Sequence, residues 1–509
     1  MVGWRRWITV LGIVNAVCFA HQTVFSYFLA AMQLDGRQPN QARFFEDLAT
    51  KVAFLGTEVQ SWLRGQSPFA SKWIALSANF LPQIISSVAF VMLLAVLVRH
   101  RQHLDEKTLR QLFGWAVLFS ALALPAFPVQ DFWLSLGWGN MIVSGLNPYH
   151  TDLTAEFAAP FPLDSSGVRM TYGPMWAILS GVVMWLAGGK TWLGALFFKL
   201  LLAGAWVGTL LLICRLLKSR SSWHQCVGVA IFGWMPLSVM QIVGDGHNDV
   251  VMVGLMLYWL CGLQRADSIW NSAWLAAAAL VKYIVAPLFL LEYLHFRYVR
   301  RGKLAAYVPH ALVSGALIAA VFGLFYRSPD FFDAALIMRG WHFYEPSSVL
   351  RAFETWFGVN LGLLYSPVRL LFPLLAVIYA VVFIRRPNES TFYLASLSFL
   401  SAVLFSVVGH VFPWYLTWVM GLAALVPWSN FGRWILGVAL FAPFTMIIAR
   451  VLPPESPEFQ RWGLPTLLLY GGSLIWLLAA RWLLPSDLAS ERVSEPSPSW
   501  TPVRSGAAG

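Results

Sequence analysis

The residues Gly244-Asp245-Gly246-His247-Asn248-Asp249 separate two apolar runs of the chain, one near 226–243 and one near 249–263. Charged groups next to hydrocarbon are costly, and membrane proteins keep them there mainly for function. A second break of this kind occurs where Asp131 follows the apolar run at 112–128. We therefore expect the two breaks to contribute to one functional site at a membrane surface.

The composition of the chain predicts a membrane protein. Of its 509 residues, 58% are hydrophobic and only 12% are charged, which is unlike a soluble globular protein. The net charge of +11 could suggest nucleic-acid binding, but the cations cluster in short loops between apolar runs, where they act as topology signals. No nucleic-acid partner is expected. The 4 cysteines show no metal-ligand spacing, so we predict neither a disulfide framework nor a zinc site.

Successive apolar runs predict an all-α polytopic membrane protein with about 12–14 transmembrane helices, since a crossing needs about 20 residues and several runs are shorter. The first run, Trp7 to about Met32, follows Arg5 and Arg6 and is too long for the core of a signal peptide, so we predict an anchor. The runs lie near residues 7–31, 74–98, 112–128, 192–214, 226–243, 249–263, 269–283, 284–297, 304–326, 366–384, 390–408, 411–427, 432–450 and 464–481.

Basic residues predict the orientation of these helices. With the N-terminus in the cytoplasm, the basic loops near 99–110, 215–220, 297–303 and 385–386 all fall on the cytoplasmic side, as the positive-inside rule requires. Pro174–Gly188 is too short to cross the membrane. Counting it as a crossing would place the basic loop near 215–220 on the outer side, so we expect a short helix that lies on, or dips into, the outer leaflet. The outward segments are then Asp131–Tyr172, Gly244–Asp249, Lys282-Tyr283, Arg327–Tyr365 and His410–Tyr415.

The chain is predicted to form one transmembrane domain over residues 1–484. Residues 1–111 are an N-terminal extension with two membrane segments, 112–450 bear the motifs, and 451–484 hold the last segment. Within the extension, Gln41–Arg64 has apolar residues at helical spacing together with six charged residues, which predicts an external interfacial helix. Residues 485–509 are rich in Ser, Pro and Ala and are expected to be a disordered cytoplasmic tail.

Several outward motifs resemble those of GT-C glycosyltransferases that use polyprenyl-phosphate sugars. Asp131 after an apolar run, followed by Gly145-x-Asn147-Pro148-Tyr149 and Tyr172-x-Pro174, resembles their first external loop. The Gly246-His247-Asn248-Asp249 break and the later Leu280-Val281-Lys282 are similar to those of bacterial polyprenyl-phosphomannose-dependent α-mannosyltransferases. The motif His410-x-x-Pro413-Trp414-Tyr415 resembles a further external motif. The resemblance spans roughly residues 112–450.

One departure from the family pattern follows the acidic residue. Relatives often have Tyr or Ser soon after it, whereas this chain has Phe132 and Trp133. The departure puts the contacts with the donor sugar in doubt more than the acidic residue itself.

The resemblance implies an inverting GT-C glycosyltransferase with mannose as the expected sugar. The donor would be a polyprenyl-phosphate sugar and the acceptor a glycan or glycolipid, at the outer face of the cytoplasmic membrane. Asp131 would be the catalytic base that deprotonates the acceptor hydroxyl. One carboxylate suffices because the leaving group is already a phosphate ester, unlike that of a glycosidase. No cofactor is expected, and His247 with Asp249 would supply only two ligands, too few for a metal site.

The other candidate residues would bind donor or acceptor. The leaving phosphate needs cations nearby, and the outward ones are Lys282, Arg169 and Arg339. Aromatic rings can stack on sugars and seat the isoprenoid, and those in place are Tyr172, Trp341, Trp414 and Tyr415. The full set of predicted binding residues is Tyr172, Asp245, His247, Asn248, Asp249, Lys282, Tyr283, Arg339, His410, Trp414 and Tyr415.

Simpler interpretations of these residues remain open at this stage. Asp131 could cap a helix that begins at Phe132, and Asn248 or Asp249 could cap the following helix. Lys282 could extend to the interface, Trp414 and Tyr415 could belong to an aromatic belt, and Arg339 and His342 could be ordinary loop residues.

Two other functions also remain open. A lipid-linked glycan transporter or flippase would bury its charges near the midplane and usually contain repeats, and no fixed-period repeat occurs here. A non-catalytic scaffold would not need acids clustered on one face.

Overall fold

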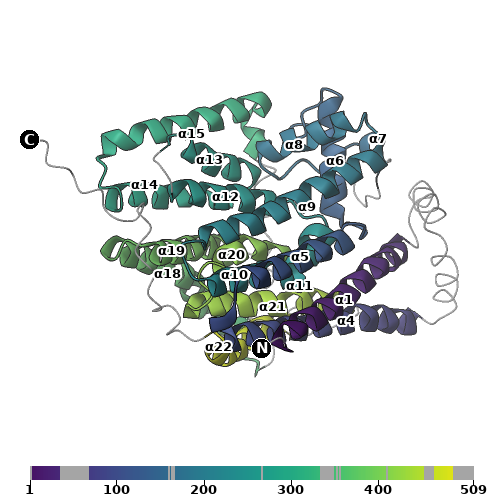
Figure 1. Cartoon of the computed structure of the whole chain (residues 1–509). Helices are drawn as coiled ribbons and strands as arrows, with labels where there is room; N and C mark the ends of the chain where they lie inside the picture. The colour runs from purple at the N-terminus through teal and green to yellow at the C-terminus, as the bar shows by residue number, and fades with distance from the viewer. Residues whose placement is uncertain are drawn as a thin grey trace, which may run out of the picture.

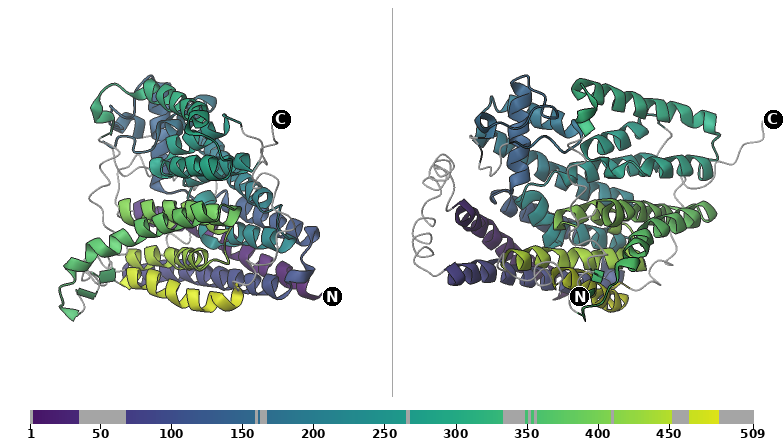
Figure 2. Two further views of the ribbon diagram at one scale, coloured as in Figure 1. Left: turned by 90° about the vertical axis from the view of Figure 1, so that its left-hand side faces the viewer. Right: turned by 180° about the vertical axis from the view of Figure 1, so that it is seen from behind.

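The computed structural model describes residues 3–34, 68–158, 161, 167–264, 268–332, 349–350, 353–354, 357–408, 411–451 and 464–484. Within these ranges the chain forms helices and turns without a strand. The predicted all-α polytopic membrane protein is therefore confirmed. The helices lie side by side across the molecule (Figures 1 and 2). The predicted interfacial helix at Gln41–Arg64 and the tail at 485–509 lie outside the described residues.

In the described part of the chain, 7 helices are long and apolar enough to cross a membrane. An eighth crossing is possible if α10 (Ser222–Trp234) and the segment Pro236–Gly244, bent by 53° relative to it, form one broken span. The helices that qualify alone are α1 (Gly3–Leu34), α4 (Pro68–Arg99), α9 (Thr191–Leu216), α15 (Leu304–Phe325), α18 (Tyr365–Arg385), α19 (Glu389–Ala402) with the π-helix η7 (Val403–Val407), and α22 (Leu464–Leu483).

The predicted number of crossings is larger because it also counted shorter apolar helices. Among these, α12 (Asp249–Leu263) has 15 residues and α13 (Asn271–Val281) has 11, both less than a bilayer requires of one helix. The total of 12–14 crossings stays a prediction. The remaining helices are α5 (Glu106–Ala123), α6 (Gln130–Val143), α7 (Ala155–Ala158), α8 (Pro174–Leu186), α11 (Pro236–Ser238), α14 (Leu288–Tyr298), α20 (Thr417–Ala423) and α21 (Asn430–Val451), with the short helical segments η1 (Arg101–His103), η2 (Val239–Gly244), η3 (Tyr283–Val285), η4 (Pro329–Phe332), η6 (Gly362–Leu364) and η8 (Pro413–Leu416).

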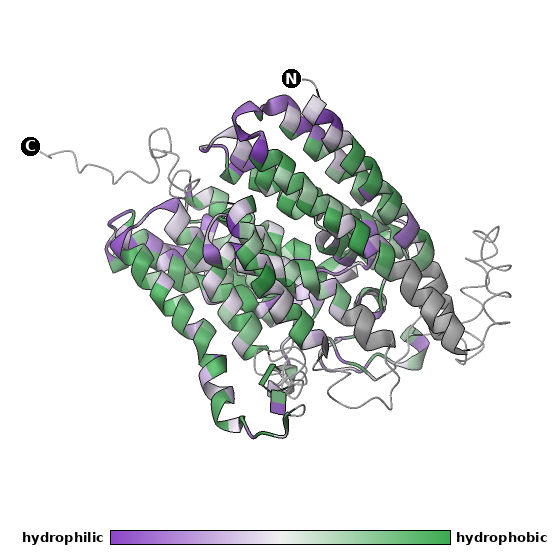
Figure 3. Ribbon diagram, turned by 90° about the horizontal axis from the view of Figure 1, so that it is seen from below, coloured by the Kyte–Doolittle hydropathy of each residue, from purple (hydrophilic) through white to green (hydrophobic). Residues whose placement is uncertain are grey.

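Bulky aromatic side chains fill the interior of the bundle, while aliphatic side chains cover its outer helices. On α18, Leu370, Leu374 and Val377 are exposed at helical spacing, as expected where a helix faces lipid. Apolar colouring along such outer helices is evident in Figure 3. The largest fully buried side chains include Trp138, Trp176, Trp206, Trp234, Trp259 and Trp418.

The short helices α6, α7 and α8 gather at one end of the bundle (Figure 1). Helices α6 and α8 pack closely because Gly139 has no side chain: a Cβ there would lie 2.4 Å from the carbonyl oxygen of Ser180. Helix α8 has 13 residues, about 20 Å at 1.5 Å per residue, in keeping with the short helix predicted at Pro174–Gly188. Asp131, in the first turn of α6, and Tyr172, just before α8, lie at this end of the bundle.

Candidate active site

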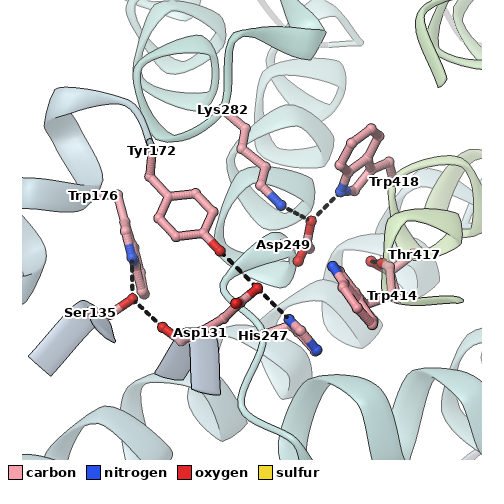
Figure 4. A network of polar contacts seen from close by, with 10 residues as sticks. All are labelled: Asp131, Ser135, Tyr172, Trp176, His247, Asp249, Lys282, Trp414, Thr417 and Trp418. Atoms are coloured by element: carbon pink, nitrogen blue, oxygen red, sulfur yellow. Dashed lines mark hydrogen bonds and ion pairs between the residues drawn. The ribbon is translucent and has the colours of Figure 1, made fainter. Parts of the chain in front are cut away.

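Four segments between or at the ends of the membrane helices bring their polar and aromatic side chains together, the first of them being the α6–α8 region (Figure 4). Asp131 lies in the first turn of α6, and Tyr172 precedes α8. His247 comes from the loop between η2 and α12, and Lys282 separates α13 from η3. The last of these segments, η8, carries Trp414 and Tyr415.

Asp131 has one occupied and one open carboxylate oxygen. Tyr172 Oη donates a hydrogen bond to Asp131 Oδ2 at 3.0 Å, and His247 Nδ1 lies 3.8 Å from the same oxygen. Oδ1 has no hydrogen-bond partner among the described residues, and 38% of the Asp131 side chain is accessible. The N-cap of α6 is Val129, and the helix begins at Gln130 instead of Phe132. Asp131 is therefore not the N-cap residue, contrary to the simpler interpretation.

The surroundings of Asp131 make its carboxylate more basic. Although solvent reaches part of the side chain, dense protein around it raises its pKa above the usual value; the Tyr172 hydrogen bond and Lys282 oppose this shift. Burial, aided by Lys282 and Lys199, holds the pKa of His247 well below its usual value. His247 is thus a neutral imidazole next to a carboxylate that is a stronger base than an ordinary aspartate.

Lys282 is held inside the site by a buried ion pair. Its Nζ lies 2.5 Å from Asp249 Oδ1, and the indole nitrogen of Trp418 donates to the same oxygen. Asp249 is fully buried, and only 11% of the Lys282 side chain is exposed. Because Lys282 extends inward, it is not a residue that reaches to a membrane interface.

Three aromatic rings surround the Lys282 ammonium group at cation–π distance. Their centroids lie 5.3 Å away for Tyr172, 4.9 Å for Tyr415 and 5.0 Å for Trp418. Tyr172 therefore contacts the cation with its ring and the Asp131 carboxylate with its hydroxyl. Tyr415 is buried beside the cation, so it does not belong to an aromatic belt.

The loop before α12 keeps unused hydrogen-bonding capacity. The His247 ring stacks on Trp414 at 4.3 Å and is 2% exposed. Three buried atoms of consecutive residues lack a partner within the described part of the chain: His247 Nε2, Asn248 Nδ2 and Asp249 Oδ2. Asn248 occupies the N-cap position of α12 but its side chain makes no capping bond. Buried polar groups are normally paired, so this loop has the donors and acceptors that hydroxyl groups of a ligand require.

Backbone contacts fix the loop against α6. Gly246 has a φ of +85°, and a Cβ at this position would lie 2.5 Å from the Phe132 ring. The Val129 amide donates to the Asp245 carbonyl at 2.9 Å. Behind the loop, Lys199 Nζ donates to the carbonyl oxygens of Val243, at 2.8 Å, and Gly244. These contacts bring His247 next to Asp131.

Lys199 was not identified from the sequence as part of the site. It lies within the apolar helix α9 and is buried. Its isolation in a long apolar segment was the available signal, because a lysine there requires a partner. The carbonyl groups at the end of η2 provide that partner, so Lys199 is a positioning residue for the loop.

The Asn147-Pro148-Tyr149 motif positions Tyr172. Asn147 Nδ2 donates to the Phe325 carbonyl at 2.6 Å, and Tyr149 Oη donates to the Tyr172 carbonyl at 2.8 Å. The Gly173 amide then donates to the Val281 carbonyl at 3.1 Å. The loop between α6 and α8 is thereby tied to the ends of α13 and α15, next to Lys282.

Gly173→Ala should disrupt the site from a distance. A Cβ at Gly173 would lie 2.1 Å from the Leu280 carbonyl oxygen, so α8 and the end of α13 would have to separate. We expect a loss of about 1–3 kcal/mol in stability together with reduced activity, measured by thermal unfolding and sugar transfer. Gly204→Ala, at a position with open space for a Cβ, is the matched control and should leave both unchanged. Equal behaviour of the two variants would contradict the role of Gly173.

The other predicted residues have different surroundings. The Tyr283 ring faces Phe322 of α15, with centroids 6.2 Å apart. Arg169 pairs with Asp152 at 3.0 Å. Phe132 and Trp133 are buried packing residues, so the departure from the family pattern affects the interior and not the open side of Asp131. Other candidates lie outside the described residues: Arg339, Trp341, His342 and His410.

The fold and these side chains define a class of protein: a multi-pass membrane enzyme with an acidic and aromatic site at one end of its helices. Residues 48–294 match a family model described as the N-terminal domain of α-(1→6)-mannopyranosyltransferases. The chain is also similar to α-(1→6)-mannopyranosyltransferase A of Mycobacterium tuberculosis (strain ATCC 25618 / H37Rv), with 25% identity over 404 residues, 73% of this chain and 75% of the relative.

These matches confirm the predicted resemblance to GT-C mannosyltransferases. They support the predicted glycosyltransferase activity of the mannosyltransferase type. Such an enzyme takes a sugar donor and a glycan or lipid acceptor.

Proposed function

We propose that this enzyme transfers mannose from a polyprenyl-phosphate donor to a glycan or glycolipid acceptor at the outer face of the cytoplasmic membrane, with inversion at the anomeric carbon. The observation that carries the proposal is that Tyr172 contacts two charged groups. Its hydroxyl binds the Asp131 carboxylate, which keeps one oxygen without a partner among the described residues, and its ring contacts the Lys282 ammonium. An inverting transfer needs a base on one side of the reacting carbon and a stabiliser of the leaving phosphate on the other.

Asp131 is the proposed general base, and Oδ1 is its reactive atom. Tyr172 and His247 both face Oδ2, so Oδ1 is the oxygen available to a hydroxyl of the acceptor. Oδ1 takes the acceptor proton as the acceptor oxygen attacks the anomeric carbon, and the bond to the donor phosphate breaks. The raised pKa of Asp131 favours this proton transfer.

Lys282 is the proposed stabiliser of the leaving phosphate. Its ammonium carries three protons, and Asp249 accepts one of them at 2.5 Å. The remaining protons can be donated to phosphate oxygens as their charge grows. The Asp249 pair and three rings hold the cation in place before the donor arrives, so little reorganisation is needed during reaction.

Tyr172→Phe should shift the pH dependence of transfer. The Tyr172 hydroxyl stabilises the ionised form of Asp131 and lowers its pKa. Removing the hydroxyl raises that pKa further, so the acid limb of kcat/KM should move to higher pH. A pH–rate profile of both enzymes tests this expectation, and a shift to lower pH or none would contradict it.

The proposed donor is tested with a panel of radiolabelled polyprenyl-phosphate sugars. Membranes containing the enzyme should move label from polyprenyl-phosphate mannose to a lipid or glycan acceptor faster than from the glucose, galactose or arabinose counterparts. Transfer from a nucleotide-linked mannose, with none from the polyprenyl-phosphate form, would contradict the proposal.

Cysteine labelling tests the proposed orientation. In a background without the 4 native cysteines, Asp152→Cys should react with a membrane-impermeant maleimide added outside intact cells, whereas Lys218→Cys should not. The first position lies between α6 and α8, and the second follows α9. Labelling at 218 without labelling at 152 would reverse the arrangement and place Asp131 on the cytoplasmic side.

A further inference from the structure

A basic pocket lies at the end of α5 opposite to the proposed active site. Its volume is about 710 Å³, and it is formed by the first turns of α1, by η1 and by the start of α5. Asp131 follows the other end of α5, whose 18 residues span about 27 Å at 1.5 Å per residue. The two sites are thus separated by roughly the thickness of a hydrocarbon core. The lining residues are Trp4, Arg5, Arg6, Thr9, His103, Lys107 and Gln111.

The pocket has more positive than negative charge. Of the two acids at the start of α5, Glu106 pairs with Arg110 at 2.7 Å. Asp105, the N-cap of α5, accepts hydrogen bonds from Thr108 N and Thr108 Oγ1 at 2.9 and 2.8 Å. It also pairs with Arg5 at 2.6 Å. Within the described residues, Arg6 and Lys107 have no acidic partner within ion-pair distance. An anion entering the pocket would therefore meet two cations that are not already neutralised.

An apolar surface continues from the charged pocket along α1. The exposed side chains at spacings of three or four residues are Trp7, Val10, Ile13 and Val17, and such spacing places them on one face of the helix. At the pocket itself, Trp4 stacks on His100, with ring centroids 5.1 Å apart. Hydrophilic colouring near the N-terminus gives way to apolar colouring along the neighbouring helices (Figure 3). A ligand that fits both parts has an anionic head and apolar chains.

We propose that this pocket binds the headgroup of an anionic glycerophospholipid, whose acyl chains lie along α1. The charge complementarity of Arg6 and Lys107 selects an anionic headgroup over a zwitterionic one. The aromatic ring of Trp4 occupies the interfacial level where such rings are favoured. The bound lipid bridges α1 and α5 and anchors α1, whose described side chains make none of the contacts of the proposed active site.

Native mass spectrometry of the purified full chain tests the proposal, with phosphatidylglycerol, phosphatidylcholine or polyprenyl phosphate added separately. Phosphatidylglycerol should be retained more strongly than phosphatidylcholine. Arg6→Gln/Lys107→Gln should weaken its retention by about 30-fold, since each cation near a membrane surface contributes about fivefold. The control Arg110→Gln/Lys218→Gln removes the same charge outside the pocket and should change retention by less than about twofold.

Three results would contradict the proposal that this pocket binds an anionic phospholipid. Equal retention of the two phospholipids would mean that the headgroup is not recognised. Equal losses of phosphatidylglycerol retention in the pocket and control variants would mean that the lipid responds to general surface charge and not to this pocket. If the pocket substitutions weakened retention of polyprenyl phosphate but not of phosphatidylglycerol, the occupant would be a different lipid. Both variants should keep mannosyl transfer, so the outcome is independent of the proposed catalytic residues.

Discussion

Asp131→Asn should lose roughly 10²–10⁴-fold in turnover while the protein still inserts, folds and binds its donor. Asparagine keeps the shape of the side chain and can still accept a hydrogen bond from Tyr172, which lies 3.0 Å from Oδ2. It cannot take the proton of the acceptor hydroxyl. Single-turnover transfer of labelled mannose, measured beside donor binding, separates the chemical step from binding.

The control for this variant is Asp152→Asn. Asp152 is an exposed acid in the segment between α6 and α8 and pairs with Arg169 at 3.0 Å, so its substitution should leave turnover within about twofold, as for most surface changes. If Asp131→Asn also kept near-normal turnover, Asp131 would not be the base. Asp245 and Asp249 would then become the acids to test.

Lys282→Met should produce two separable defects. Fully buried Asp249 would lose its cation at 2.5 Å, and breaking a buried pair in this way costs about 3–5 kcal/mol of stability. The variant should also use the donor poorly, because a charge-assisted contact with phosphate contributes about 1.5–3 kcal/mol. That range corresponds to about a 10- to 150-fold increase in donor KM.

A double variant distinguishes the structural effect from the binding effect. Lys282→Met/Asp249→Asn removes both buried charges, and an asparagine oxygen can still accept from Trp418. Thermal stability should recover in large part, whereas donor KM should stay high. Recovery of donor KM together with stability would show that Lys282 supports only the fold. Lys190→Met, at the exposed start of α9, should change neither quantity.

Helix positions could be predicted well because each apolar run is bounded by polar residues. The run at 249–263 corresponds to α12, Asp249–Leu263, and the run at 304–326 to α15, Leu304–Phe325. The alternative in which Asp131 caps a helix beginning at Phe132 is wrong, because α6 begins at Gln130 and Val129 is its N-cap. The first and last residues of a helix depend on backbone geometry, which a hydropathy pattern does not predict.

The residue types of the site could be predicted, but their partners could not. The approach of Tyr172 to Asp131 spans 41 residues, and that of Trp418 to Asp249 spans 169. Both depend on how α8, α12 and α20 pack, including the close contact at Gly173. Lys199 and Trp418 were missed for the same reason, since each lies within an apolar segment and gains its role only through a distant chain partner.

The most direct measurement of the central claim is the stereochemistry of mannose transfer by the purified enzyme. Polyprenyl-phosphate mannose of known anomeric configuration would be the donor, and nuclear magnetic resonance would identify the anomer in the product. With Asp131 as base in a single displacement, the product should have the opposite configuration, and Asp131→Asn should form almost none of it. A product with retained configuration, or an inverted product formed at the normal rate by Asp131→Asn, would contradict this mechanism.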